Sequence, residues 1–290
     1  MVTRRVSEDV RHCLVDASGY QNTCFKNRFA LLKSFFSIVP LVKKEYMSSD
    51  TPTDAVLSTD AVSPNDAARI AAIIKQRRTF KVLAASSANQ TVAETTQPLT
   101  EEQRLTADAQ VIQAIRDAGW APFHYDRAAD AMAEPWRVEW LPQAKCREVA
   151  ANFFQWFDDV KPNNKLPSML NACGSLVLVS WLPQFTDQNS ATSSLTEKQQ
   201  QVDEEHLAAT AAYVQNLMLI LTAHGLGTYW SSGGQFRTEV MRRKLGVDHD
   251  GRLLAAVFVD YQAERDSVER LPGKLRERRS PGQQWFKSIG

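Results

Sequence analysis

The sequence lacks most of the signatures that would assign a function directly. Its 34 Lys and Arg residues against 33 Asp and Glu leave a formal net charge of +1, so no overall basic field would recruit nucleic acid or an anionic membrane. It contains neither a G-x-G-x-x-G fingerprint after a strand nor the G-K-S/T of a P-loop. No apolar stretch reaches the length that spans a bilayer. We therefore expect neither nucleic acid nor a membrane as partner.

Cysteine is also scarce. The four residues Cys13, Cys24, Cys146 and Cys173 include no C-x-x-C pair and have no neighbouring His cluster, which argues against a zinc site and a dithiol redox motif. No disulfide framework is evident, as is typical of proteins in a reducing cytoplasm. We expect a cytoplasmic protein in which Cys173, inside an apolar run, is a small buried residue.

The composition is that of a globular protein, with 43% hydrophobic and 23% charged residues, but residues 1–62 differ from the rest. Residues 48–63 are rich in Ser, Thr, Asp and Pro, and residues 1–46 show neither a helical period nor alternation. We expect residues 1–62 to be an N-terminal extension, flexible or partly spurious, with Met47 as a possible start. Basic residues before the apolar run 29–42 leave a signal-like segment as the alternative.

Residues 63–290 carry interleaved helical and strand patterns, which favour a single α/β or α+β domain. Ser63-Pro64 and the capping box Thr100–Gln103 predict two helix starts. Alternation and unbroken apolar runs predict strands over 136–141, 176–182 and 253–261. Helical patterns predict helices over 143–157, 204–224 and 235–245, and polar composition predicts loops over 85–98 and 184–200.

Two basic clusters lie at opposite ends of this domain. In Arg77-Arg78-Thr79-Phe80-Lys81, guanidinium forks, a hydroxyl and an ammonium group can grip a phosphate, although cations at a helix end also simply complement its dipole. The second cluster, Arg276-Glu277-Arg278-Arg279-Ser280-Pro281, is either a solvated tail or part of a site. Trp285-Phe286 beyond it indicates a chain that still packs onto something. The two clusters are candidates to converge on one phosphate.

A glycine-rich stretch, Leu226–Gly234, follows the longest predicted helix. Its glycines allow backbone N–H groups to approach a ligand closely, and Trp230 offers a flat surface. An ordinary glycine turn with a buried Trp is the alternative.

Taken in order, these segments resemble the nitroreductase family of FMN-dependent oxidoreductases from about Asp66 to Gly290. The family's opening Arg-Arg-Ser/Thr-x-Arg/Lys and closing Arg-x-Pro are matched at 77–81 and at 279–281. The family's Ala-Pro is matched by Ala121-Pro122, and its Gln-Pro-Trp by Glu134-Pro135-Trp136. Its long dimer helix, which ends in glycines, is matched by Gln215-Asn216-Leu217 with Gly225–Thr228, and its loop beside the flavin by Trp230–Gly233.

The resemblance implies an α+β fold with a central, mostly antiparallel sheet flanked by helices, in an intertwined homodimer that holds FMN at its interface. It implies that NAD(P)H reduces FMN, which passes electrons by a ping-pong mechanism to a nitroaromatic, quinone or similar small-molecule acceptor. The chemistry would take place on the flavin, with no catalytic side chain and no metal. The alternatives are other flavin chemistry, such as dehalogenation or flavin breakdown, and a flavin-binding carrier or sensor with little turnover.

The resemblance also implies which residues bind the cofactor. The residues expected to bind the FMN phosphate, here called the phosphate group, are Arg77, Arg78, Thr79, Lys81 and Arg279. Those expected to line the flavin ring, the ring group, are Pro122, His124, Pro135 and Trp136. A third group, Trp230, Ser231, Ser232 and Gly233, is expected on the remaining flavin surface.

One segment departs from the family pattern. Residues 123–133 are longer and differently charged than the usual short Ser/Asn stretch, and Glu134 replaces a Gln, so that a carboxylate that only accepts stands for an amide that can donate. The segment either contacts the flavin or only shapes the pocket. Neither His124 nor His206 has carboxylates or cysteines spaced for a metal site; we expect His124 near the substrate and His206 exposed on its helix.

Overall fold

The computed structural model describes residues 63–84, 99–127, 132–185, 195–261, 268–275 and 278–289. The expectations for residues 1–62, for the loop 85–98, and for Arg276 and Glu277 lie outside the described residues. The same holds for the middle of the departing segment, residues 128–131.

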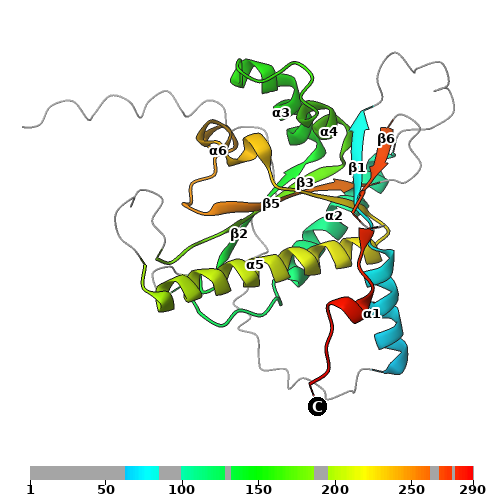
Figure 1. Cartoon of the computed structure of the whole chain (residues 1–290). Coiled ribbons are helices and arrows are strands. Elements are labelled where there is room, and N and C mark those ends of the chain that lie inside the picture. Colours follow the sequence, from blue (N-terminus) through cyan, green and yellow to red (C-terminus); the bar gives the residue numbers. More distant parts are fainter. Residues whose placement is uncertain are drawn as a thin grey trace, which may run out of the picture. The chain divides into compact units, whose positions relative to one another are not determined.

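The centre of the domain is a four-stranded antiparallel sheet in the order β2-β3-β5-β4 (Figure 1). The two central strands are buried on both faces because their sequences are almost entirely apolar. The strands are β2 (Trp136–Pro142), β3 (Ser175–Trp181), β4 (Gly227–Ser231) and β5 (Arg252–Asp260). The α+β fold with a central, mostly antiparallel sheet is thereby confirmed.

A second, two-stranded sheet lies beside the edge strand β4. It pairs β1 (Phe80–Ala84) with β6 (Val268–Pro272) in antiparallel fashion, and a parallel bridge between Thr79 and Thr228 joins it to β4. This pairing brings Thr79, just before β1, next to the C-terminal part of the chain, where the candidate site lies.

Helices cover both faces of the main sheet. Figure 1 shows α2 and α5 on one side, and α3, α4 and α6 on the other. Their bounds are α2 (Glu101–Ala118), α3 (Gln143–Trp156), α4 (Leu166–Ala172), α5 (Glu197–Ala223) and α6 (Glu239–Leu245), with the short 3-10 helix η2 (Gly234–Arg237) before α6. The remaining helical elements are α1 (Pro64–Gln76) and the 3-10 helix η4 (Gly282–Gln284).

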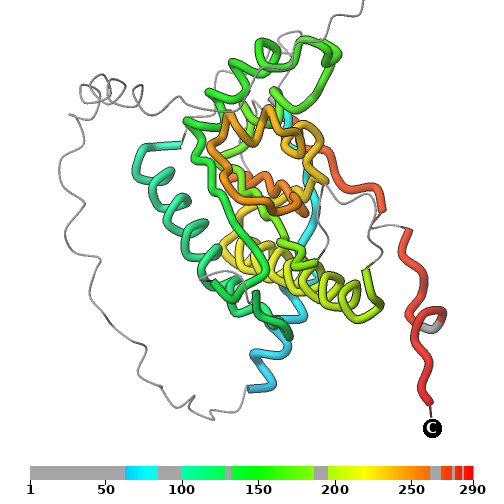
Figure 2. The backbone as a smooth tube through the Cα atoms, turned by 90° about the vertical axis from the view of Figure 1, so that its left-hand side faces the viewer, coloured from blue at the N-terminus to red at the C-terminus, as the bar shows by residue number. Residues whose placement is uncertain are grey.

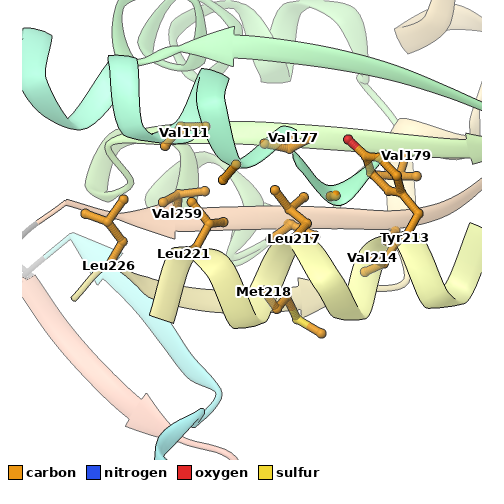
Figure 3. Close-up of a cluster of buried hydrophobic side chains, with 14 of the residues drawn as sticks. Val111, Val177, Val179, Tyr213, Val214, Leu217, Met218, Leu221, Leu226 and Val259 are labelled. Carbon is orange, nitrogen blue, oxygen red and sulfur yellow. The ribbon is translucent and has the colours of Figure 1, made fainter. Parts of the chain in front are cut away.

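The larger core cluster lies between the sheet and the pair α2 and α5. Figure 3 shows Tyr213, Leu217 and Leu221 pointing from α5 toward the strands that carry Val177 and Val259. Leu217 and Leu221 are fully buried, and burial of such a side chain contributes roughly 1.5–3 kcal/mol. A second cluster fills the space under α3, α4 and α6.

Helix α5 corrects one sequence expectation. Among the described residues it is the helix that is long and apolar enough to cross a membrane by length and composition, although no such stretch was expected. In the structure 44% of its apolar window is buried, since its inner face makes the core just described. The helix therefore acts here as the core helix of the sheet.

Helix starts follow their capping signals. Ser63 and Thr100 cap α1 and α2 in capping boxes with Asp66 and Gln103, as predicted. Helix α5 starts at Glu197, capped by Thr196, so the predicted start at 204 was wrong and the loop predicted over 184–200 is too long. The helix predicted over 235–245 is divided, because Thr238 ends η2 and caps α6.

Candidate functional site

The two basic clusters meet in one cavity, here called the basic pocket. Gly273 at the end of β6 donates its N–H to the carbonyl of Thr79 at 2.9 Å, which closes the β1–β6 pair at that end. The adjoining cavity has a volume of about 390 Å³. It is lined by Arg77, Arg78, Thr79, Phe80, Pro272, Gly273, Lys274, Leu275 and Arg279. Every charged residue among the described lining residues is a cation, so this part of the pocket suits an anion.

Local sequence explains how the pocket forms. Helix α1 ends at Gln76, and Arg77 leaves it with extended ψ and turns the chain toward β1. Arg77 Nη1 donates to Thr79 Oγ1 at 3.4 Å, which orients both groups on the same side of the turn. Gly273 fits this place because a Cβ there would lie 3.2 Å from Thr79 Cβ. The glycine thus permits the close approach that brings the two clusters together.

An ion pair fixes β6 to the main sheet. Arg270 Nε donates to Asp260 Oδ2 at 2.7 Å, and its terminal nitrogen lies 3.3 Å from Oδ1. Both side chains are largely buried, at the end of β5 next to Gly227 of β4. This bidentate contact between a guanidinium and a carboxylate is stronger than a neutral hydrogen bond. It positions the strand that leads to Gly273 and Lys274.

Lys81 does not line the basic pocket, although the family resemblance placed it in the phosphate group. Its Nζ lies 5.7 Å from the ring centre of Tyr229. Burial, and then the positive charge of Lys165, lower the pKa of Lys81. No ion pair joins either lysine to a carboxylate among the residues that the structure describes. Lys81 on β1 and Lys165 at the start of α4 form a second cationic spot, separate from the pocket.

The ring group lies elsewhere. Trp136 at the start of β2 pairs with Trp181 of β3, which in turn pairs with Arg252 at the start of β5. Thr228 of β4, which bridges to Thr79, pairs with Val259 near the end of β5. Three strand spacings and seven register positions therefore separate Trp136 from Thr228, which is about 14 Å across and about 23 Å along the sheet. One subunit therefore does not bring Trp136 to the basic pocket.

Within the ring group, burial divides the residues. Pro135 and Trp136 are buried, and Trp136 packs against Tyr213 at 5.3 Å and against the edge of Phe123 at 5.7 Å between ring centres. Pro122 and His124 are exposed. Pro135 and Trp136 thus lie in the buried interior, while Pro122 and His124 lie on the surface.

The third predicted group is a strand and a tight turn, where a glycine loop was expected. Gly227–Ser231 is edge strand β4, and Trp230 packs against the larger core cluster with Nε1 3.4 Å from the carbonyl of Leu254. Ser231 Oγ accepts the N–H of Gly233 at 3.3 Å, and the carbonyl of Ser232 accepts from Arg237. Gly233 has φ +104°, a conformation that favours glycine.

His206 corrects another expectation. It is 1% exposed, and not an exposed helix residue. Its Nδ1 lies 3.2 Å from the carbonyl of Leu182 and its Nε2 3.1 Å from the carbonyl of Tyr125. Arg127 donates to the carbonyl of Pro183 at 2.6 Å. These contacts anchor the described part of the departing segment to α5 and to the end of β3.

No side chain in the described ranges stands out as a metal ligand or an activated nucleophile. They contain no group of three His, Cys, Asp or Glu residues placed to hold a metal. Hydrogen bonding to Cys146 and burial raise the pKa of the Cys173 thiol, and both cysteines are buried as free thiols. Cys173 is buried as predicted, and its chemistry is that of an inert core thiol.

Comparison with known proteins supplies the family. The sequence profile of the nitroreductase family matches residues 94–259. The chain belongs to the nitroreductase family. A relative from Bacillus subtilis (strain 168), YfhC, provisionally named an NAD(P)H nitroreductase, is 22% identical over 173 residues, which span 58% of this chain and 81% of the relative.

Solved structures of nitroreductase-like proteins are similar as well. A nitroreductase-like protein from Bacillus cereus gives a TM-score of 0.49 at 21% identity, over 76% of this chain and 95% of that one. A protein from Desulfovibrio desulfuricans that is provisionally named a nitroreductase, in complex with FMN, gives a TM-score of 0.41 at 17% identity, over 76% of this chain and 96% of that one. In this nitroreductase-family chain, the described lining of the basic pocket includes one charged residue that sequence reasoning missed. This residue is Lys274, which lies just before the second basic cluster, Arg276–Pro281. The basic residues from Arg270 onward could have indicated that the cluster begins earlier.

Proposed function

We propose that the chain is an FMN-dependent NAD(P)H oxidoreductase that reduces a small-molecule acceptor and works as a homodimer. The basic pocket carries the proposal. Family membership calls for an anionic cofactor, and the pocket offers four cations and a hydroxyl, with no carboxylate among the described residues that line it. Residues 63–290 would form the FMN-binding domain, and residues 1–62 an extension to it.

The pocket fits a phosphate group on physical grounds. Guanidinium groups bind phosphate oxygens through charge-assisted, often bidentate hydrogen bonds. Arg77, Arg78 and Arg279 would supply these, Thr79 a further hydroxyl, and Lys274 a point charge. Gly273 keeps the wall beside Thr79 free of a side chain. These residues would hold FMN by its phosphate.

The remaining residues would bind and shield the rest of the cofactor. FMN, when bound, supplies the hydride and electron chemistry, so no acid–base pair from the chain is required. Lys81 and Lys165 place positive charge beside Tyr229, and charge near a flavin tunes its electronics. Trp230, Ser231, Ser232 and Gly233 would form the wall next to β4.

The separation of the two groups supports the proposed homodimer. Because the ring group lies at the opposite corner of the sheet from the basic pocket, Pro122, His124, Pro135 and Trp136 would reach FMN from the partner subunit. Exposed apolar surface supports such a partner. Trp120 is 89% exposed, and α1 has no buried residue although Ile70 and Ile74 share one of its faces.

The acceptor would be a nitroaromatic, a quinone or a similar small molecule, reduced in a ping-pong cycle. The test is anaerobic titration of the purified protein with NADH or NADPH, followed by addition of a quinone or a nitroaromatic. We expect bleaching of the flavin absorbance by one nicotinamide cofactor and its return on adding acceptor. Dehalogenation or oxygen-dependent flavin breakdown is the alternative chemistry. The first would show as NAD(P)H consumption that requires a halogenated substrate as the electron acceptor, and the second as loss of the flavin itself in the presence of NAD(P)H and oxygen.

A flavin carrier or sensor is the second candidate. The observation that favours it is the anchoring of the departing segment by His206 and Arg127, since a fixed cover next to the ring group would hinder entry of an acceptor. Bound FMN without bleaching by either nicotinamide cofactor would select this function over the reductase.

A further inference from the structure

A second cavity lies on the opposite side of the main sheet from α5, between the strands and the η2–α6 segment. Its volume is about 350 Å³, within the range of about 300–1,000 Å³ that is typical of small-molecule sites. It shares no lining residue with the basic pocket. Its apolar floor includes Leu178, Phe236 and Leu253, which belong to the second core cluster. We call it the arginine pocket.

The rim of the arginine pocket is positively charged. Its lining contains Arg237, Arg242 and Arg252 against a single carboxylate, Glu139. That carboxylate already has a partner, because His249 Nε2 lies 2.7 Å from Glu139 Oε1. The N–H of Gly251 donates to His249 Nδ1 at 2.9 Å, so Nδ1 is the acceptor and Nε2 carries the proton that Glu139 accepts.

Two of these arginines are held in place by backbone carbonyls. Arg242 donates through Nη1 to the carbonyl of Gly251 at 2.9 Å and through its other terminal nitrogen to the carbonyl of His249. Arg237 donates through Nε to the carbonyl of Ser232 at 2.5 Å. No ion pair joins Arg237 to a carboxylate within the part of the chain that the structure describes. Its two terminal nitrogens therefore remain as a positioned fork.

A positioned guanidinium fork above an apolar floor matches a particular kind of ligand. The fork fits the two oxygens of a carboxylate. Leu178 and Phe236 are buried, so the apolar surface open to a ligand beside the fork belongs to the half-buried Leu245 and Leu253. A flat hydrocarbon body that covers this surface displaces water from it. We propose that the arginine pocket binds a small organic carboxylate with a flat apolar body, its carboxylate on Arg237 beside Arg242 and its body on the apolar floor.

The test is calorimetric titration of the purified full-length protein with benzoate, using benzamide as the neutral ligand of the same shape. Arg237→Gln should weaken benzoate binding by about ten- to a hundredfold, as expected for loss of charge-assisted hydrogen bonds. Arg147→Gln, which changes the charge of an exposed residue on α3, should leave it unchanged. Benzamide should bind at least about tenfold more weakly than benzoate.

A steric variant locates the binding. Leu245 lines the cavity from α6 and is half-buried, so Leu245→Trp should fill the pocket and abolish benzoate binding, while Leu245→Met should retain it. The absence of benzoate binding to the wild-type protein would overturn the proposal. So would benzoate binding that survives both Arg237→Gln and Leu245→Trp, or inorganic phosphate that competes as well as benzoate. FMN content, read from absorbance in every variant, separates this outcome from failure of the proposed flavin function.

Discussion

Arg77 and Arg279 reach the basic pocket from opposite ends of the domain, and each carries a test of the phosphate assignment. Arg77→Ala and Arg279→Ala should each weaken FMN binding by roughly ten- to a hundredfold, because a hydrogen bond to a charged group contributes about 1.5–3 kcal/mol. Neither side chain is buried, so the fold should survive. Fluorescence titration with FMN measures the affinity. The matched control is Arg147→Ala, which changes an exposed residue on α3. Unchanged affinity in both variants would remove these arginines from the site.

His206 offers a second residue-scale test, of the departing segment. His206→Gln should lower the free energy of unfolding by about 1–3 kcal/mol, because the amide places its N–H groups differently from the ring nitrogens and can leave a buried carbonyl without its donor. This corresponds to about 2–4 °C in Tm for each kcal/mol. His224→Gln is the control, since His224 is exposed at the end of α5. Thermal unfolding decides, and equal Tm values for the two variants would contradict the anchoring role.

At the residue scale, the sequence predicted chemistry better than position. Arg77, Arg78, Thr79 and Arg279 were assigned to one anion, and all line one pocket. Lys81 was placed with them because it belongs to the same run, but strand β1 starts at Phe80 and turns Lys81 toward Tyr229. His206 was expected on the surface because its helix pattern is weak and its partners, Tyr125 and Leu182, lie far away in sequence.

At the scale of elements, strand β6 positions the C-terminal half of the basic pocket. Asp260→Asn should weaken FMN binding although Asp260 lines no part of that pocket, because loss of the charged contact with Arg270 frees β6. The same change should lower the free energy of unfolding by about 1.5–3 kcal/mol. Glu269→Gln, on the same strand but exposed, is the control. FMN titration and thermal unfolding measure both effects; an unchanged FMN affinity would show that the pocket does not depend on the ion pair.

Elements with strong local signals were predicted, and those made by distant pairing were not. The N-cap signal Ser63-Pro64 and the capping box at Thr100 predict α1 and α2 from local sequence alone. Alternation over 136–141 and the apolar run over 176–182 predict β2 and β3 in the same way. Strands β1, β4 and β6 escaped because their stability comes from each other and from β5. The same distant pairing creates the basic pocket, so its two halves could be matched only as motifs.

For the whole molecule, the C-terminal segment points to a partner subunit. Sequence reasoning expected Trp285 and Phe286 to pack onto something, yet they are 75% and 69% exposed in the single chain. Figure 2 shows this red segment extending away from the helices and strands. Trp285→Ser combined with Phe286→Ser should therefore weaken the dimer while leaving the Tm of the separated subunit nearly unchanged. Sedimentation velocity over a dilution series measures it; dimer dissociation identical to wild type would exclude this segment from the interface.

The most direct test of the central claim is the visible absorbance spectrum of the purified protein, with FMN quantified after denaturation. The basic pocket and the family assignment predict a yellow protein that carries equimolar FMN per subunit, or that takes it up stoichiometrically when FMN is added. A protein that is colourless and does not bind added FMN would contradict the account, because the pocket between Thr79 and Arg279 would then serve another anion.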